Sequence, residues 1–104
     1  MKAKAATKEQ KRRFEGMKVL GCIACILDNR TWAYPDIHHM TRNNKRLGHW
    51  ETVPLCAEHH VSNTKISWHM KRATFRKRYG TDAELIATTN EFLKAKGLWN
   101  DTDR

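Results

Sequence analysis

Two short clips of metal-binding side chains are the feature that most constrains the fold of this chain. Cys22 and Cys25 are separated by two residues, and Cys56 and His59 repeat that spacing further along. Thiolate and imidazole groups at such spacings are typical of tetrahedral zinc sites, in which two clips close around one ion. The sequence therefore predicts a structural zinc ion, and its expected ligands are Cys22, Cys25, Cys56 and His59.

The three cysteines leave two other interpretations open. They could be buried, unreactive thiols, because an odd number cannot pair completely as disulfides. Cys22 and Cys25 could also form a thioredoxin-like redox pair, although no β-α-β pattern surrounds them. Gly21, which precedes the first clip, offers the backbone freedom that a tight metal-binding turn requires. A metal clip is the simplest of the three explanations.

Length and charge limit the class of protein. The chain has 104 residues, enough for one small domain whose apolar core is marginal without a bound metal. Lys and Arg number 20 against 11 Asp and Glu, which gives a net charge of +9 and favours nucleic acid as the partner. No run approaches the roughly 18 apolar residues of a membrane helix, and the first residues lack a secretory signal. We therefore expect a cytoplasmic protein without a membrane partner.

A pair of adjacent histidines lies between the clips. His38 and His39 follow a Pro-Asp turn and can belong to a short extended strand. Neighbouring side chains of a strand point to opposite faces, so one imidazole can bind a metal while the other faces an attacking water. A neutral imidazole can take a proton from water, and a divalent cation can neutralise a scissile phosphate. The pair therefore suits phosphodiester hydrolysis, although such pairs are more often surface or core features.

Two further histidines favour the catalytic interpretation. His60 follows the second clip directly, and His69 comes after a polar stretch at 61–65 that is suited to a turn or a helix start. If both converge on His38, the three imidazoles form a metal site with open positions for water and phosphate. The alternative for His69 is an ordinary histidine beside a helix.

Several stretches together form a family pattern that none of them forms alone. They cover residues 37–40, 46–56, 58–60, 67–69 and 71–80. Over roughly residues 20–90 the chain resembles the HNH (ββα-metal, His-Me finger) endonucleases and, within them, the phage Ref recombination enhancement nucleases. The resemblance implies a metal-dependent DNA endonuclease in which His39 is the general base. It implies the zinc ligands named above. It also implies that one catalytic cation is bound by His38, His60 and His69.

The chain departs from the wider HNH pattern at one position. Glu51 stands where the family usually has an asparagine before Val-Pro-Leu-Cys. The Ref-like branch is similar to this chain there, so the resemblance still implies an active enzyme in which Glu51 or Thr52 braces the metal loop by hydrogen bonding. His49 is expected to contact DNA, while Trp50 belongs either to the core or to the DNA-binding surface.

The segment at 41–46 is basic, polar and without apolar periodicity, so we expect a loop. Arg42, Lys45 and Arg46 are candidate contacts to DNA phosphates, with arginine best suited to bidentate contact. The alternative is a solvated loop without a ligand.

The remaining segments predict two C-terminal helices and the limits of the folded domain. Residues 70–79 show one apolar stripe in a basic helix that Gly80 ends, and Thr81 with Glu84 reads as a capping box. A second helix then follows up to Gly97, with an apolar face made of Leu85, Ile86, Thr89, Phe92 and Leu93. We expect a basic flexible arm over 1–16, a nuclease domain over 17–97 and a frayed tail over 98–104.

The sequence thus predicts a small α+β protein: a zinc-braced ββα-metal (HNH) fold with an additional C-terminal helix. The catalytic cation is expected to be Mg²⁺ or Mn²⁺, although three histidines would also accept Zn²⁺ or Ni²⁺. The Ref resemblance implies a RecA-type recombinase filament as a partner and, for a phage-encoded protein, the host cytoplasm. The alternative function is a zinc-finger-like module that binds nucleic acid without cleaving it.

Overall fold

The first element is a helix where a flexible arm was expected. In the computed structural model, which describes residues 5–62 and 66–100, α1 (Lys8–Leu20) begins at a capping box. The backbone N–H of Gln10 donates to the Thr7 hydroxyl, and the Gln10 side chain accepts from the Thr7 N–H at 2.7 Å. The prediction of a flexible arm over 1–16 is therefore wrong for 8–16, whereas 1–4 lie outside the described residues.

One of the buried side chains of α1 is an arginine, a residue type that is usually exposed. Arg13 is fully buried, and its guanidinium donates to the Thr52 hydroxyl at 3.1 Å and to the Thr52 carbonyl at 2.6 Å. It also donates to the Asn90 side chain and lies 4.9 Å from the Trp99 ring. One arginine thus joins α1 to a strand and to the last helix. The sequence alone does not predict this role, because Arg13 stands in a run of charged residues. Only the fold shows that Arg13 is buried whereas Arg12 is exposed.

Gly21 separates α1 from the short helix α2 (Ile23–Leu27). Its φ is +88°, and a Cβ built there would lie 2.5 Å from Cδ1 of Trp32, so the turn has no room for another residue. The expected backbone freedom at this position is confirmed.

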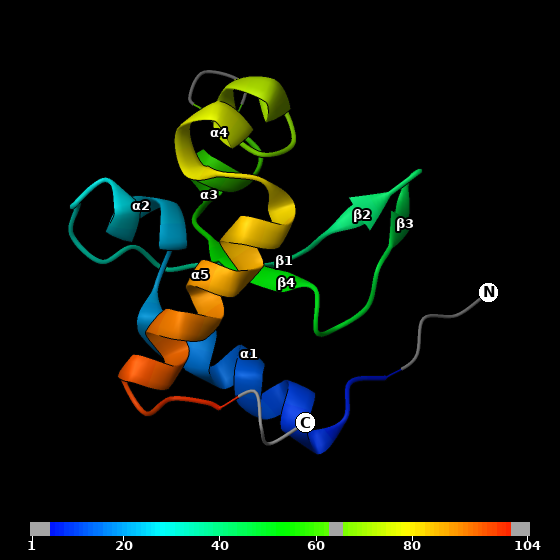
Figure 1. Ribbon diagram of the computed structural model, residues 1–104, viewed down its shortest axis with the longest axis vertical. Helices are drawn as coiled ribbons and strands as arrows, with labels where there is room; N and C mark the ends of the chain where they lie inside the picture. Colours follow the sequence, from blue (N-terminus) through cyan, green and yellow to red (C-terminus); the bar gives the residue numbers. More distant parts are fainter. Residues whose placement is uncertain (1–4, 63–65, 101–104) are drawn as a thin grey trace.

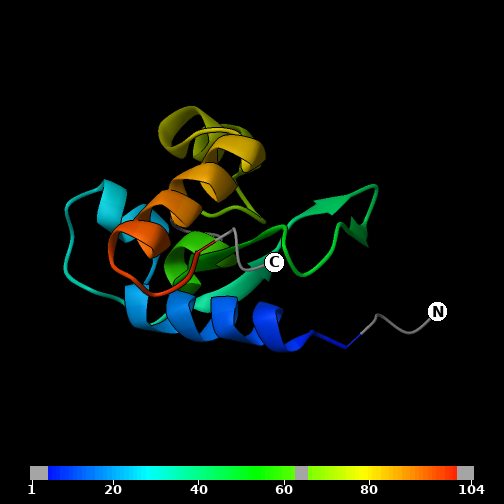
Figure 2. The same ribbon diagram turned by 60° about the horizontal axis from the view of Figure 1, so that its bottom comes forward.

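An antiparallel pair of strands follows. β1 (Asp36–His39) pairs with β4 (Thr52–Leu55) in a register that places His38 opposite Val53 and His39 opposite Thr52. α1 packs on both strands and α5 packs on β4. Figure 2 shows α1 running along one side of this pair, with α5 on the other side.

A second, smaller hairpin replaces the loop expected at 41–46. β2 (Thr41–Arg42) pairs with β3 (Lys45–Arg46), and Asn43 and Asn44 between them have φ values of +53° and +63°. Two central residues with positive φ make the tight turn that matches the twist of a hairpin, and asparagine tolerates it. Figure 1 shows this hairpin projecting away from the helices.

The C-terminal half is helical. α3 (Ala57–His60) follows β4 directly, α4 (Arg72–Tyr79) ends at Gly80, and α5 (Asp82–Ala95) starts at the predicted capping box of Thr81 and Glu84. The stop at Gly80 and the capping box are confirmed. Within the polar stretch at 61–65, the predicted turn or helix start falls partly on residues 63–65, outside the described residues.

Two apolar clusters hold these elements together. The larger one includes Ile23, Leu55, Trp68 and Phe75 beside the clip cysteines, and the smaller one joins α1 to α5 and to Trp99. Trp99 is 4% exposed, so the frayed tail predicted over 98–104 is wrong for 98–100; residues 101–104 lie outside the described residues.

The tail residues are fixed because Trp99 meets the half-buried Trp50, whose ring centroid lies 5.6 Å away. Trp50 therefore belongs to the core. Because α1 and Trp99 both pack on the body of the domain, the predicted limits of 17–97 are too narrow. The α+β class is confirmed. In the described part of the chain, no helix is both long and apolar enough to cross a membrane.

Candidate functional site

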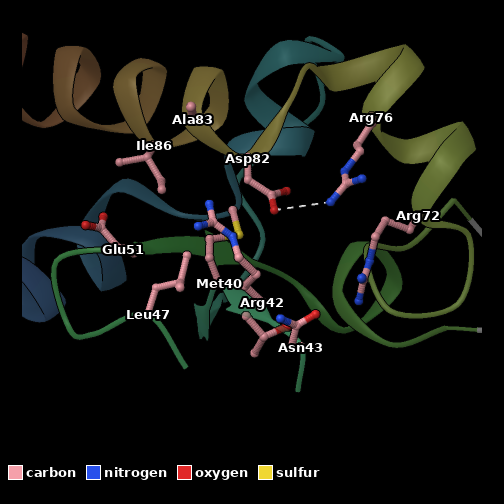
Figure 3. Close-up of a pocket in the computed structure, with 11 residues that line it drawn as sticks. Met40, Arg42, Asn43, Leu47, Glu51, Arg72, Arg76, Asp82, Ala83 and Ile86 are labelled. Carbon is pink, nitrogen blue, oxygen red and sulfur yellow. Dashed lines mark hydrogen bonds and ion pairs between the residues drawn. The ribbon is translucent and has the colours of Figure 1, made fainter. Parts of the chain in front are cut away.

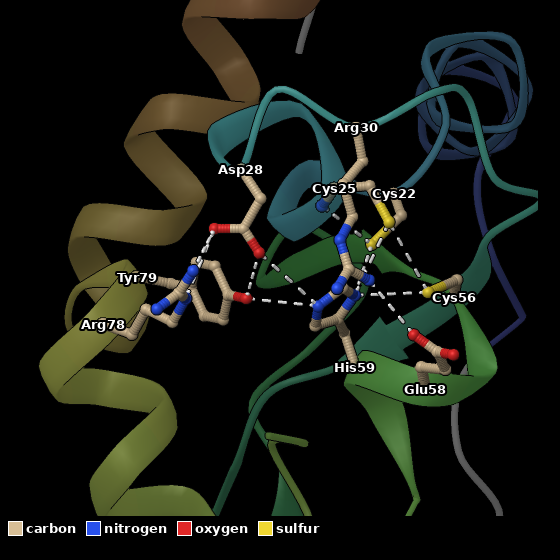
Figure 4. Close-up of polar contacts among 9 residues, drawn as sticks. All are labelled: Cys22, Cys25, Asp28, Arg30, Cys56, Glu58, His59, Arg78 and Tyr79. Atoms are coloured by element: carbon tan, nitrogen blue, oxygen red, sulfur yellow. Dashed lines mark hydrogen bonds and ion pairs between the residues drawn. The ribbon is translucent and has the colours of Figure 1, made fainter. Parts of the chain in front are cut away.

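Three thiols and one imidazole meet where α2 faces the start of α3 (Figure 4). Nδ1 of His59 lies 3.5 Å from Sγ of Cys22, 3.6 Å from Sγ of Cys25 and 3.2 Å from Sγ of Cys56. The sulfurs of Cys25 and Cys56 are 3.8 Å apart. All four residues are buried and no cysteine forms a disulfide. The two clips predicted from their spacing therefore do come together.

These separations fit one tetrahedral ion. Zinc bonds of about 2.3 Å to sulfur and about 2.0 Å to nitrogen imply ligand separations of about 3.8 Å between sulfurs and about 3.5 Å between sulfur and nitrogen. The measured values, from 3.2 to 3.8 Å, lie close to both. The donor set, three thiols and one imidazole, is a common one for structural zinc. A possible metal site of this kind is thus present in the fold.

A chain of polar contacts fixes the orientation of the His59 ring. Nε2 of His59 lies 3.1 Å from the Tyr79 hydroxyl, which donates to Oδ2 of Asp28 at 2.6 Å. Arg78 donates to the other oxygen of Asp28 at 3.0 Å. With Nε2 so engaged, Nδ1 is the nitrogen presented to the sulfurs. Ligand histidines in metal sites are usually oriented by such outer contacts.

The electrostatics of this cluster follow from burial. Burial raises the pKa of the Cys22 and Cys25 thiols above the usual value and lowers the pKa of His59. Burial and the hydrogen bond to Asp28 raise the pKa of Tyr79 to about 12, so its hydroxyl stays a donor. Although burial opposes it, the hydrogen bonds from Tyr79 and Arg78 lower the pKa of Asp28. A positive ion among the sulfurs would favour their thiolate forms.

A second cluster consists of three histidines. His38 lies on β1, His60 at the end of α3, and His69 just before α4, and their ligand atoms all lie within 4.8 Å of one another. The backbone N–H of His69 donates to the His60 carbonyl at 3.1 Å, which returns the chain to α3 after the 61–65 stretch. The convergence on His38 expected from the sequence is therefore present.

His38 carries the clearest sign of a missing partner. Its ring is 2% exposed, and Nε2 is one of the few buried side-chain atoms without a hydrogen bond among the described residues. Burial, followed by the charges of His60 and His69, lowers the pKa of His38 to about 3, so its ring is neutral. Nδ1 of His60 lies 3.0 Å from Oδ2 of Asp36, which leaves its Nε2 for the cluster. A cation among the three rings would satisfy the unpaired nitrogen.

His39 faces the other side of β1. Its Nε2 lies 3.0 Å from Nδ1 of His49, and the Phe14 ring meets both imidazoles edge to face. Burial, followed by the charges of Arg46 and His49, lowers the pKa of His39 to about 4. His39 is therefore neutral at physiological pH and can accept a proton.

The predicted DNA contacts divide into two groups. Arg42, Lys45 and Arg46 lie exposed on the β2–β3 hairpin, whereas His49 is half-buried against His39. The hydroxyl of Thr52, which receives the Arg13 bond, donates to the His49 carbonyl at 2.9 Å. Thr52 thus makes a side-chain hydrogen bond within the 49–52 loop, and a role for any of these residues in bracing the metal loop or in DNA binding stays a prediction.

Sequence reasoning missed several residues around the two clusters. Tyr79 and Asp28 support His59, Asp36 supports His60, and the guanidinium carbon of Arg72 stacks 3.8 Å from the Trp68 ring beside the histidines. No spacing rule identifies such partners, because they come from separate elements. Only the fold brings them together.

A comparison with family models places this geometry in context. The model described as "Recombination enhancement, RecA-dependent nuclease" matches residues 6–94, which include both clusters and the helix α1. A search among curated proteins found no match. Because the family model matches most of the sequence, the chain belongs to the family of RecA-dependent recombination enhancement nucleases.

Proposed function

We propose that this nuclease is a metal-dependent DNA endonuclease of the HNH type. In this proposal β1, β4 and α3 form the ββα-metal unit, and the catalytic cation is held by His38, His60 and His69. The observation that carries the proposal is the buried ring of His38, whose Nε2 has no hydrogen bond and which lies together with two more imidazoles, while the next residue, His39, contacts His49 instead.

The cation, when bound, would neutralise charge on the scissile phosphate and the leaving oxygen. Mg²⁺ or Mn²⁺ is expected, and three imidazoles would also accept Zn²⁺ or Ni²⁺. His60 is held for this task by Asp36, and His38 is held by the Trp68 ring, whose centroid lies 4.2 Å from its own. The protein thereby fixes two of the three rings before the cation arrives.

His39 is proposed as the general base. A neutral imidazole can remove a proton from the attacking water, and the low pKa of His39 keeps it in that form. Its Nε2 shares a hydrogen bond with Nδ1 of His49, so His49 orients the ring in the absence of substrate. Thr52 in turn anchors the His49 carbonyl and thereby supplies the bracing that asparagine gives elsewhere in the HNH family.

The other predictions from the sequence complete the proposal. A zinc ion on the four clip residues would be structural, because all of its ligands are buried and no position is left for substrate. The cations of the hairpin, Arg42, Lys45 and Arg46, would contact phosphates without reading sequence. The family description further supports a RecA filament as the partner on DNA.

Cleavage assays test the proposal. Purified protein is incubated with supercoiled plasmid and with RecA-coated DNA, in Mg²⁺ or Mn²⁺, beside His39→Ala. We expect divalent-dependent cleavage that His39→Ala abolishes while its zinc content and melting temperature stay unchanged. Wild-type cleavage by His39→Ala would refute the role of the base. No cleavage of either substrate by folded, metal-loaded protein would favour the non-catalytic binding module.

A further inference from the structure

A cavity of about 740 Å³ lies between the β2–β3 hairpin and the adjoining ends of α4 and α5 (Figure 3). Arg72 lines it, and its guanidinium lies 3.8 Å from the ring of Trp68, whose centroid is 4.2 Å from that of His38. An occupant that contacts Arg72 would therefore lie close to the proposed catalytic cation. Its volume is in the range of sites that enclose a small organic molecule.

Cations approach the cavity from two sides. Arg42 reaches in from the hairpin and Arg72 from α4, whereas Arg76, also on α4, is paired with Asp82 at 3.4 Å. Guanidinium groups so arranged suit the phosphates of a DNA strand, which they can bind in a bidentate manner. Arg72 is held by its stack on Trp68, at 3.8 Å, and so presents a planar cation of fixed orientation.

The rest of the lining does not suit a phosphate. Met40, Leu47 and Ile86 supply apolar surface, and Leu47 is 44% exposed, which is high for a leucine. Glu51 adds a carboxylate, which repels phosphate and can accept hydrogen bonds from amino groups. The other carboxylate, Asp82, already accepts from Nε1 of Trp68 at 2.9 Å and from Arg76 at 3.4 Å. Apolar surface together with the Glu51 carboxylate matches a nucleobase, whose faces are apolar and whose edge carries donors.

We propose that this cavity binds one unpaired nucleotide of the DNA strand beside the scissile phosphate. Its base would lie on Leu47 and Ile86, and its flanking phosphates on Arg42 and Arg72. A base stacked and paired within a duplex cannot enter such a site, so the nucleotide must belong to a single strand or leave the stack. This inference rests on the proposed nuclease function and assigns it an unpaired substrate.

Binding measurements test this inference without cleavage. The zinc-loaded full chain, without Mg²⁺ or Mn²⁺, is titrated with a fluorescent oligothymidine of about six nucleotides and with an abasic oligomer of equal phosphate number. We expect about tenfold tighter binding of the strand that carries bases. Equal affinity for the two strands would overturn the inference, while the nuclease could still cleave.

Variants locate the base. Leu47→Ala, a change at an exposed position that the fold tolerates, should reduce the tenfold preference to about threefold or less and leave abasic binding unchanged. Arg42→Ala should weaken both strands by a similar factor. Lys77→Ala is the matched control, because Lys77 is an exposed cation of α4 outside the cavity lining. A preference that survives Leu47→Ala would refute the assignment.

Discussion

The hydroxyl of Tyr79 lies 3.1 Å from Nε2 of His59, the nitrogen on the far side of the ring from the three sulfurs. Through this contact the end of α4 orients a proposed zinc ligand that belongs to α3. The same hydroxyl is anchored by Asp28, next to α2, so three helices share one polar chain.

Removing that hydroxyl should weaken zinc binding. Tyr79→Phe keeps the ring but loses the hydrogen bonds to His59 and Asp28, and we expect a roughly tenfold faster transfer of zinc to a chromogenic chelator. Tyr34→Phe is the control. Tyr34 is 67% exposed, and its ring packs against Trp32 rather than against a clip residue. Equal rates for the two variants would show that the contact does not support the metal.

Chelation of zinc should unfold much of the domain. The three clip cysteines belong to the larger apolar cluster, and without the ion their burial is not compensated by metal bonds. We expect a fall in melting temperature of more than about 10 °C after dialysis against a strong chelator, with recovery on adding Zn²⁺. Circular dichroism during heating measures it; an unchanged melting temperature would contradict a structural zinc ion.

Replacing the buried arginine should destabilise the fold. Arg13→Met leaves the Thr52 carbonyl and the Asn90 side chain without their donor, at an expected cost of roughly 3 kcal/mol in the free energy of unfolding. Arg12→Met removes the same charge from an exposed position and should change stability by less than about 0.5 kcal/mol. Urea unfolding compares the two, and similar values would contradict the role of Arg13.

Gly21 should tolerate no side chain. Gly21→Ala combines a positive φ of +88° with a contact of 2.5 Å to the Trp32 ring, and we expect a loss of roughly 2 kcal/mol or more. Gly97→Ala has a positive φ of +65° but open space around the added carbon, so it should cost only about 1 kcal/mol. Denaturant unfolding decides, and a smaller loss at Gly21 than at Gly97 would contradict the prediction.

Acid should destabilise the protein through His39. An unfolded histidine takes up a proton near pH 6.5, whereas burial lowers the pKa of His39 in the fold to about 4. Stability from this residue is therefore complete above pH 6.5 and is lost as the pH falls toward 4. His39→Gln should make the decline of unfolding free energy between these values shallower than in the wild type, at equal zinc occupancy. Identical slopes would contradict the burial of a neutral ring.

The sequence predicted those parts of the site that depend on spacing along the chain. Both members of each clip lie within one turn of a helix start, so their distance apart is nearly fixed before folding. The convergence of His69 depends instead on a backbone bond to His60, and a loop of that length allows many shapes. The prediction that His69 joins His38 and His60 therefore rested more on the family resemblance than on the spacing of the residues.

The errors in the fold prediction have a common cause. In the first half of α1, Arg13 is a fully buried side chain, whereas binary patterning reads it as a solvent-facing charge. In the hairpin, Asn43 and Asn44 supply the turn, but the two-residue strands have no buried face that would show periodicity. Polar residues that act through specific partners are invisible to pattern rules, because the partners lie far away in the sequence.

The arrangement of β1 has a consequence for how the chemistry is encoded. His38 and His39 are neighbours in a strand of four residues, so their opposite orientations depend on its pairing with β4. A shift of one residue in that pairing would turn every side chain to the other face. The His39 ring, which now faces Phe14, would then face the other imidazoles, and the His38 ring would lose them. The different surroundings of two chemically identical side chains thus depend on the register of two short strands.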